Sequence, residues 1–280
     1  MTEATLPAPG GRSAGTVRQR TGRWLSRNAL YAFTTAAIIY LMLPIAVMII
    51  FSFNDPIGKS NFTWVGFSLD AWLNPFGALG LQDALFASLR IAFISTVVAT
   101  VLGTLIGLAL TRYQFRGRGA TNLFIFLPMA TPEIVLGASL LTMFVAIEQP
   151  RNELTILIAH IMFNISFVVV TVRARLTGFP RHLEEAAMDL YANEMTTFWK
   201  VTFPLILPGI IAAALLAFSL SIDDFVITNF TAGKAQTFPM FIYAKNRIGV
   251  PPQVNVIGTI IFLVAVGGVL LTTLNARRKR

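Results

Sequence analysis

The sequence predicts an all-α polytopic membrane protein with six transmembrane helices. Of its 280 residues, 55% are hydrophobic and only 12% are charged, and the mean hydropathy is +0.69. Soluble globular chains carry about 25% charged residues. A helix needs about 20 mostly apolar residues to cross a bilayer, and the sequence contains several runs of that length.

Six apolar runs define the expected spans. They cover residues 29–53, 85–110, 121–147, 154–172, 204–222 (or to 230 if that helix continues) and 254–275. The first run is too long for the core of a signal peptide and lacks a small-residue cleavage pattern, so we expect it to be retained. Together the spans form one predicted membrane domain, residues 29–275, between a basic tail (1–28) and a basic C-terminus (276–280).

The basic residues predict the orientation of these spans. Sixteen Lys and Arg residues fall on the side of the two termini and five on the opposite side, with Arg90 near the start of the second span. Because basic loops stay in the cytoplasm, both termini are predicted to be cytoplasmic. Topology therefore explains the net charge of +9, and the basic residues lack the interleaved aromatics of a nucleic-acid site. We expect the N-terminal tail to be disordered.

Proline and small residues predict how the spans pack. Pro44, Pro128 and Pro132 lie inside the first and third spans and should kink or interrupt them. Gly103 and Gly209 belong to stripes of small residues that let neighbouring helix backbones approach closely. Either these features serve helix packing alone, or broken helices line a transport pathway.

The residues needed for an enzyme centre are missing from the sequence. There is no cysteine, there are two histidines (His160 and His182), and neither a GKS/T phosphate-binding loop nor an HExxH motif occurs. We therefore expect no catalytic residue, no metal site and no cofactor bound by this chain. An integral-membrane enzyme is the least favoured class of function.

A polar segment separates the fourth and fifth spans. The connection, residues 173–203, is longer than two neighbouring spans require. Its apolar positions follow the i, i+3, i+4, i+7 spacing of an amphipathic helix: Leu183, Ala186, Ala187 and Leu190. The rest of this helix is acidic, with Glu184, Glu185 and Asp189. Helices that lie on lipid carry basic polar faces, so this hairpin of two short helices is predicted to dock on a protein.

The same segment resembles the cytoplasmic EAA loop of binding-protein-dependent ABC importer permeases. The matching positions are Glu185, Ala186, Ala187, Leu190, Ala192, Phe198, Val201, Pro204, Pro208, Gly209 and Ile210. The resemblance implies the type I ABC importer permease fold, with residues 177–203 as coupling helices that insert into a groove on a cytoplasmic ATPase. The coupling residues that it implies are Glu184, Glu185, Ala186, Ala187, Asp189, Leu190, Tyr191 and Ala192.

Tyr191 departs from the family pattern, which commonly has glycine at this position. Glycine adopts a positive φ without strain, whereas tyrosine does so at a cost. Two alternatives follow. Either the turn is built differently, with Asn193 in the left-handed region, or Tyr191 adds contact surface for the partner.

Ionisable side chains inside a span are costly and mark candidate sites. Three stand out: Glu133, Asp223 and Asp224. Each also has a structural interpretation, because Glu133 could begin the second half of a broken helix and the aspartates could lie at a water-exposed helix end. His160 and Asn164, at i and i+4 in the fourth span, are interpreted as interhelical hydrogen-bonding residues.

A second resemblance concerns the cargo. Residues 219–233 and 238–260, with the ProGlu pair at 132–133 and the run at 159–164, are similar to the spermidine/putrescine permeases. This similarity implies Asp223, Asp224 and Glu133 as polyamine-pathway residues. It also implies a second permease subunit, two cytoplasmic ATPase subunits that bind ATP and Mg, an extracytoplasmic binding protein, and a place in the bacterial inner membrane.

Two alternatives to polyamine import remain open at this stage. The same importer architecture serves other cargoes, such as iron, thiamine, organic phosphates or sugars. A channel or secondary transporter belongs to another class, but it would have no use for an acidic cytoplasmic hairpin, and the sequence shows no inverted repeat.

Overall fold

The computed structural model describes residues 15–58, 60–178, 180 and 182–278. Disorder is predicted for the whole N-terminal tail, but helix α1 begins at Gly15, so the prediction is wrong for residues 15–28. Residues 1–14 and the basic residues Arg12, Lys59, Arg181, Lys279 and Arg280, which entered the prediction of orientation, lie outside the described residues.

The described residues form helices, with one isolated bridge between Asn54 and Phe67. The helices are α1 (Gly15–Phe51), α2 (Asp70–Leu73), α3 (Leu81–Arg112), α4 (Arg118–Ala130), α5 (Glu133–Ala146), α6 (Glu153–Thr177), α7 (His182–Asp189), α8 (Glu194–Thr197), the π-helix η1 (Phe198–Thr202), α9 (Phe203–Asp223), α10 (Val226–Thr231), α11 (Phe238–Asn246) and α12 (Pro252–Arg278). The predicted all-α class is confirmed.

The predicted count of six spans is only approximate. Among the described residues, four helical stretches are long and apolar enough to cross a membrane: Ala29–Phe51, Leu81–Arg112, Glu153–Thr177 and Glu194–Asp223. The third predicted span consists of two helices, α4 and α5, and the direction of the chain bends by 110° at the break between them. The sixth lies in α12, where the shorter stretch Pro252–Gly268 is apolar. The fifth begins at Glu194, earlier than predicted, and ends at Asp223 without continuing to residue 230.

Proline explains the break in the third span. Pro132 has no backbone N–H, and it restricts the preceding Thr131 to an extended conformation, with φ −83° and ψ 132°. Helix α4 therefore ends at Ala130, and α5 begins at Glu133. Pro128 and Pro44 lie within α4 and α1 without ending them, so Pro132 is the one of the three that interrupts its span.

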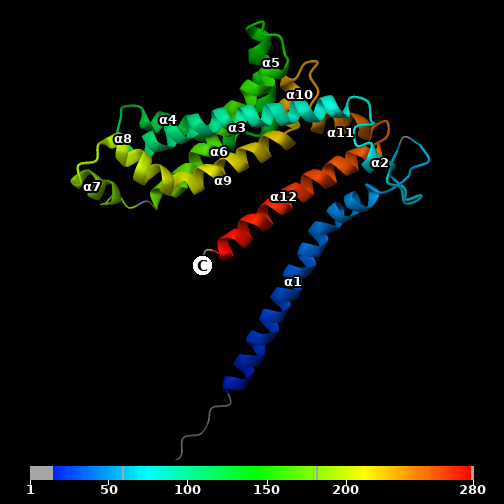
Figure 1. Ribbon diagram of the computed structural model, residues 1–280, viewed down its shortest axis with the longest axis horizontal. Coiled ribbons are helices and arrows are strands. Elements are labelled where there is room, and N and C mark those ends of the chain that lie inside the picture. The colour runs from blue at the N-terminus through cyan, green and yellow to red at the C-terminus, as the bar shows by residue number, and fades with distance from the viewer. Residues whose placement is uncertain (1–14, 59, 179, 181, 279–280) are drawn as a thin grey trace, which may run out of the picture.

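Helices α3, α6 and α9 pack side by side and form the centre of the protein (Figure 1). Their shared core consists of Ala99, Val168, Val172, Leu176, Ile206, Ala213 and Ala217, with partly buried neighbours. A Cβ atom on Gly103 would lie 2.6 Å from Cγ1 of Val168, and one on Gly209 would lie 2.7 Å from Cβ of Arg175. The predicted close approach at these glycines is therefore confirmed.

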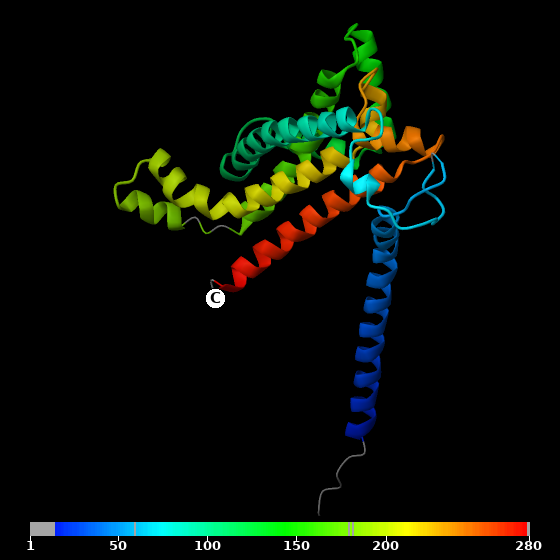
Figure 2. The ribbon, with the colours of Figure 1, turned by 45° about the vertical axis from the view of Figure 1, so that its right-hand side comes forward.

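Helices α3 and α9 run from the hairpin of α7 and α8 at one end to α10 and α11 at the other (Figure 1). Helix α1 extends away from this group in both views (Figure 2), and it contacts α12. The two ends of α3 and α9 thus hold the two regions that the sequence marks as candidate sites.

Candidate functional site

The first candidate region is the end of α9, where Asp224 turns the chain into α10. Asp224 has an extended backbone, with φ −63° and ψ 120°. Its carboxylate accepts the backbone N–H groups of Ile227 at 3.3 Å and Thr228 at 2.8 Å, and the Thr228 hydroxyl at 2.6 Å. An aspartate that bonds to the following N–H groups begins a helix and competes with continuation of the preceding one. This local chemistry explains why α9 stops at Asp223.

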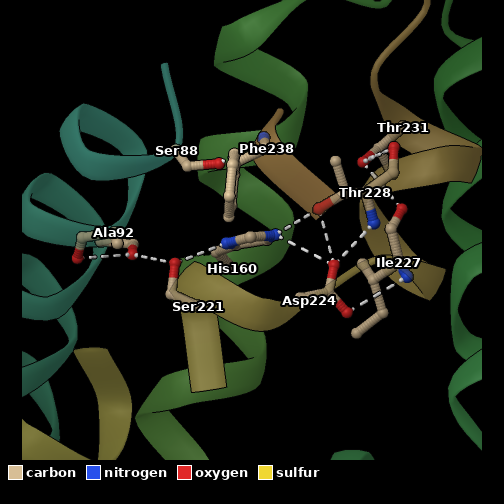
Figure 3. A network of polar contacts seen from close by, with 10 residues as sticks. Ser88, Ala92, His160, Ser221, Asp224, Ile227, Thr228, Thr231 and Phe238 are labelled. Carbon is tan, nitrogen blue, oxygen red and sulfur yellow. Dashed lines mark hydrogen bonds and ion pairs between the residues drawn. The ribbon is translucent and has the colours of Figure 1, made fainter. Parts of the chain in front are cut away.

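The Asp224 carboxylate also meets His160 from α6. Nε2 of His160 lies 3.2 Å from Oδ2 of Asp224 and 2.9 Å from the Thr228 hydroxyl (Figure 3). Because that hydroxyl donates to Asp224, it accepts from His160, and the network assigns a proton to Nε2. The side chains of His160 and Asp224 are only 4% and 8% exposed. Multiple donors therefore compensate for the burial of Asp224.

The network continues through serine hydroxyls to α3. Nδ1 of His160 lies 2.6 Å from the Ser221 hydroxyl (Figure 3). The Ser221 hydroxyl lies 3.0 Å from the hydroxyl of Ser95. Four elements, α3, α6, α9 and α10, are thus joined by buried polar contacts, which are strong in a medium of low dielectric. The predicted interhelical role of His160 is confirmed. The same prediction is wrong for Asn164, because its buried amide atoms have no hydrogen-bond partner among the described residues.

Asp223 faces a different environment from its neighbour. It is exposed, and it lines a cavity of about 470 Å³ between the end of α9, α11 and α12, together with Phe225, Tyr243, Asn246 and other residues. The ring centroids of Phe225 and Tyr243 lie 4.6 Å apart, with 36° between the ring planes. Asp223 is the charged residue of this lining. A carboxylate beside aromatic rings attracts organic cations.

Glu133 occupies the first position of α5, as its structural interpretation predicts. Its side chain is exposed, and the N-cap residue before it, Pro132, provides no side-chain cap. It is not among the residues that line the cavity at Asp223. The three predicted pathway residues therefore lie in three different surroundings.

The second candidate region is the hairpin of α7 and α8, whose two short helices and turn match the prediction. The turn after α7 has the hydrogen bonds of a Schellman motif: Ala192 N–H to the Ala187 carbonyl at 3.1 Å, and Tyr191 N–H to the Met188 carbonyl at 2.9 Å. Tyr191 occupies the position where this motif requires a left-handed residue, and its φ is 60°. Asn193 has φ −74° and caps α8 through the Thr196 N–H, so the alternative with a left-handed Asn193 is wrong.

Most of the predicted coupling residues project from the hairpin. Every residue of α7 is described and none is buried, and Leu190 and Tyr191 are 82% and 100% exposed. Glu184, Ala187 and Ala192 are only partly exposed, and Glu184 is held by contacts within the chain. Its Oε1 accepts Nη2 of Arg112 at 2.8 Å and the Thr202 hydroxyl at 2.6 Å, and its side chain is 20% exposed. The hairpin therefore offers an acidic and apolar surface, while Glu184 turns toward the chain itself.

The fold is a helical bundle with an exposed hairpin at one end and a buried polar network at the other end of the same helices. These features define a membrane transport subunit. Residues 99–280 match the model of the family described as binding-protein-dependent transport system inner membrane component. The chain belongs to this family, and it is a multi-pass membrane protein.

Curated relatives cover nearly the whole chain. It is 35% identical to the spermidine/putrescine transport system permease protein PotC of Haemophilus influenzae, over 91% of this chain and 98% of the relative. It is 37% identical to the PotC protein of Escherichia coli K12, over 88% of this chain and 93% of the relative. It is also 37% identical to the putrescine transport system permease protein PotI of the same strain, over 86% and 88%.

Solved structures share the fold at low sequence identity. A chain of a bacterial ABC transporter involved in import of the acidic polysaccharide alginate superposes with a TM-score of 0.65 at 16% identity, covering 94% of this chain and 99% of that one. A chain of the MetNI methionine ABC transporter superposes with a TM-score of 0.54 at 20% identity, covering 71% and 93%. The predicted ABC importer permease fold is thus confirmed.

Proposed function

We propose that this chain is a permease subunit of an ATP-driven importer for polyamines in the bacterial inner membrane, with both termini in the cytoplasm. Its partners would be a second permease subunit, two ATPase subunits that bind ATP and Mg, and an extracytoplasmic binding protein. The permease would alternate between inward-open and outward-open states, driven by closure of the ATPases. The curated relatives, whose names specify spermidine and putrescine, support this proposal.

The observation that carries the cargo assignment is the cavity at Asp223. It combines one carboxylate, the paired rings of Phe225 and Tyr243, and the amide of Asn246. Polyamines are flexible chains with several ammonium groups, so the Asp223 carboxylate and the Phe225 ring suit them, whereas this carboxylate disfavours an organic phosphate. The Tyr243 ring already has the Arg247 guanidinium over one face, 5.5 Å from the ring centroid. Asp223 is exposed, which leaves its carboxylate accessible to a passing cation that must also be released.

The hairpin supports the assignment of an ATPase partner. Its tip residues Leu190 and Tyr191 leave apolar surface uncovered, and Glu185 and Asp189 are exposed beside them. Apolar side chains with a polar rim are typical of protein interfaces. We assign the exposed residues of α7 to docking on the ATPase, and Asp223 to the cargo path.

Uptake competition tests the cargo class. Vesicles containing the complete importer, loaded with ATP inside and given binding protein and radiolabelled spermidine outside, should accumulate label. Unlabelled putrescine or spermidine should suppress this accumulation, while thiamine, ferric iron, glycerol phosphate and maltose should not. Suppression by one of the latter compounds but not by putrescine would assign the importer to another cargo.

A further inference from the structure

One carboxylate oxygen of Glu184 joins three helical elements at the hairpin end of the bundle. It accepts hydrogen bonds from Arg112 and from Thr202. Arg112 is the last residue of α3, and Thr202 is the last residue of η1, directly before α9. The side chains of Arg112 and Glu184 are 16% and 20% exposed, so water screens this ion pair less than a surface pair.

Apolar packing does not hold α7 in place. None of its residues is buried, and a cavity of about 360 Å³, lined by Met188, Phe198 and the three bonded residues, lies between α7, α3 and η1. Hydrophobic burial therefore contributes little to the attachment of α7. The hydrogen bonds of Glu184 link this helix to both of its long neighbours.

The two elements that Glu184 joins lead to the candidate cargo site. In α3, Ser95 lies 17 residues before Arg112, or about 25 Å along the helix at 1.5 Å per residue. Ser221 in α9 lies 19 residues after Thr202, or about 28 Å. The hydroxyls of Ser95 and Ser221 lie 3.0 Å apart, and Ser221 precedes Asp223 by two residues. Helices α3 and α9 are thus linked at both ends, by Glu184 and by the serine pair.

We infer that Glu184 is a positioning residue that makes α7, α3 and α9 move together, so that displacement of the hairpin by the ATPase reaches the cavity at Asp223. The inference rests on the proposed docking of α7 to an ATPase. A hairpin drives a conformational change only through contacts that tie it to the moving elements. Without the Glu184 bonds, α7 follows the ATPase while α3 and α9 stay behind. Glu184 therefore acts inside the chain, unlike the exposed Glu185 that precedes Ala186 on the docking surface.

The experiment compares Glu184→Gln with Glu148→Gln in the complete importer in vesicles. Glu148 is an exposed carboxylate in the turn after α5, outside the hairpin. Three quantities are measured: ATPase subunit retained on the membrane, stimulation of ATP hydrolysis by the binding protein, and spermidine molecules imported per ATP. Glu184→Gln should retain the ATPase but lose stimulation and imported cargo per ATP by at least about fivefold, the low end of coupling between linked sites. Glu148→Gln should match wild type.

A charge exchange separates positioning from a general loss of structure. Glu184→Arg and Arg112→Glu should each uncouple the importer, and the double variant should recover at least half of the imported cargo per ATP. Wild-type coupling in Glu184→Gln, or failure of the double variant to exceed both single variants, would overturn the inference. If Glu184→Gln does not assemble, Thr202→Val takes its place. This variant removes the hydrogen bond from Thr202 to Glu184 and keeps the ion pair with Arg112, and it should show the same loss of stimulation and of imported cargo per ATP. Stimulation of ATP hydrolysis needs no assumption about cargo, so absence of spermidine import by wild type would reject the polyamine assignment separately.

Discussion

Nε2 of His160 lies 3.2 Å from Oδ2 of Asp224, which divides the two adjacent aspartates into different roles. Asp224 accepts bonds from two backbone N–H groups and a threonine hydroxyl beside the imidazole of His160, and only 8% of its side chain is exposed. Asp223, one residue earlier, is exposed at a cavity with aromatic walls. We therefore propose that Asp224 holds α9, α10 and α6 together and that Asp223 is the residue that meets the cargo.

Substitution of Asp224 should destabilise the protein. Removing one member of a buried pair leaves its donors unpaired, so Asp224→Ala should lower the free energy of unfolding by about 3 kcal/mol. His160→Ala should lower it by a similar amount. The double variant should lose clearly less than the sum, because both changes remove the same contact. Thermal unfolding in detergent measures all three, with Asp223→Ala as a control that changes stability by less than about 0.5 kcal/mol. Additive losses would show that the two side chains are not coupled.

Relief of backbone strain at Tyr191 should stabilise the turn of the hairpin. A left-handed conformation costs an ordinary residue about 1 kcal/mol or more, and glycine adopts it freely. Tyr191→Gly should therefore slow hydrogen exchange at the Ala192 amide, which bonds to the Ala187 carbonyl across the turn. Tyr191→Val, which is β-branched and disfavours positive φ, should accelerate that exchange. Equal exchange rates in the three proteins would contradict the assignment of strain to this residue.

Reversal of charge at Glu185 should weaken docking without unfolding the membrane domain. Its side chain is exposed on a helix that has no buried residue, so Glu185→Arg should cost this chain less than about 0.5 kcal/mol in stability. At an interface the same change should reduce ATPase retention on washed membranes by about tenfold or more. Ala186→Arg, at another exposed position of α7, should act in the same way, and Lys200→Glu, exposed on η1, serves as a charge-reversal control. Full retention and wild-type import in Glu185→Arg would remove α7 from the docking surface.

Glycine at the contact of α3 and α6 should tolerate no added carbon. A Cβ at Gly103 would lie 2.6 Å from Val168, whereas nothing lies within 4 Å of a Cβ at Gly267 in α12. Gly103→Ala should therefore lower stability by about 1–3 kcal/mol through overpacking. Gly267→Ala should be neutral or slightly stabilising, since alanine favours helix over glycine. Melting temperatures of the two variants test this contrast, and equal values would argue against close packing at Gly103.

Local patterns predicted the elements better than they predicted the site. Helical spacing and the acidic rim indicated α7, and Pro132 indicated the break between α4 and α5. The direction of a side chain depends on residues far along the chain, which no local pattern contains. Glu184 meets Arg112, 72 residues away, and so turns inward although its neighbour Glu185 is exposed.

The polar network shows the same limit. His160 was identified because a histidine inside a span is costly, but its partners Ser221 and Thr228 are common residues with no distinguishing local signal. The different environments of Asp223 and Asp224 arise from the start of α10, where Asp224 bonds to the backbone of the next turn. The alternative extension of the fifth span to residue 230 is wrong for the same reason, since the apolar residues after Asp224 belong to a separate helix.

The most direct measurement is the concentration dependence of spermidine uptake by vesicles carrying Asp223→Asn. Asn has nearly the same shape as Asp but lacks the charge, and a hydrogen bond to a charged group contributes about 1.5–3 kcal/mol. Asp223→Asn should therefore reduce ATP-driven spermidine uptake by about tenfold to a hundredfold, with the ATPase still bound and the melting temperature unchanged. Asp55→Asn, at an exposed aspartate outside the cavity, should leave uptake at the wild-type level. Wild-type uptake by Asp223→Asn would contradict the assignment of this cavity to a polyamine path.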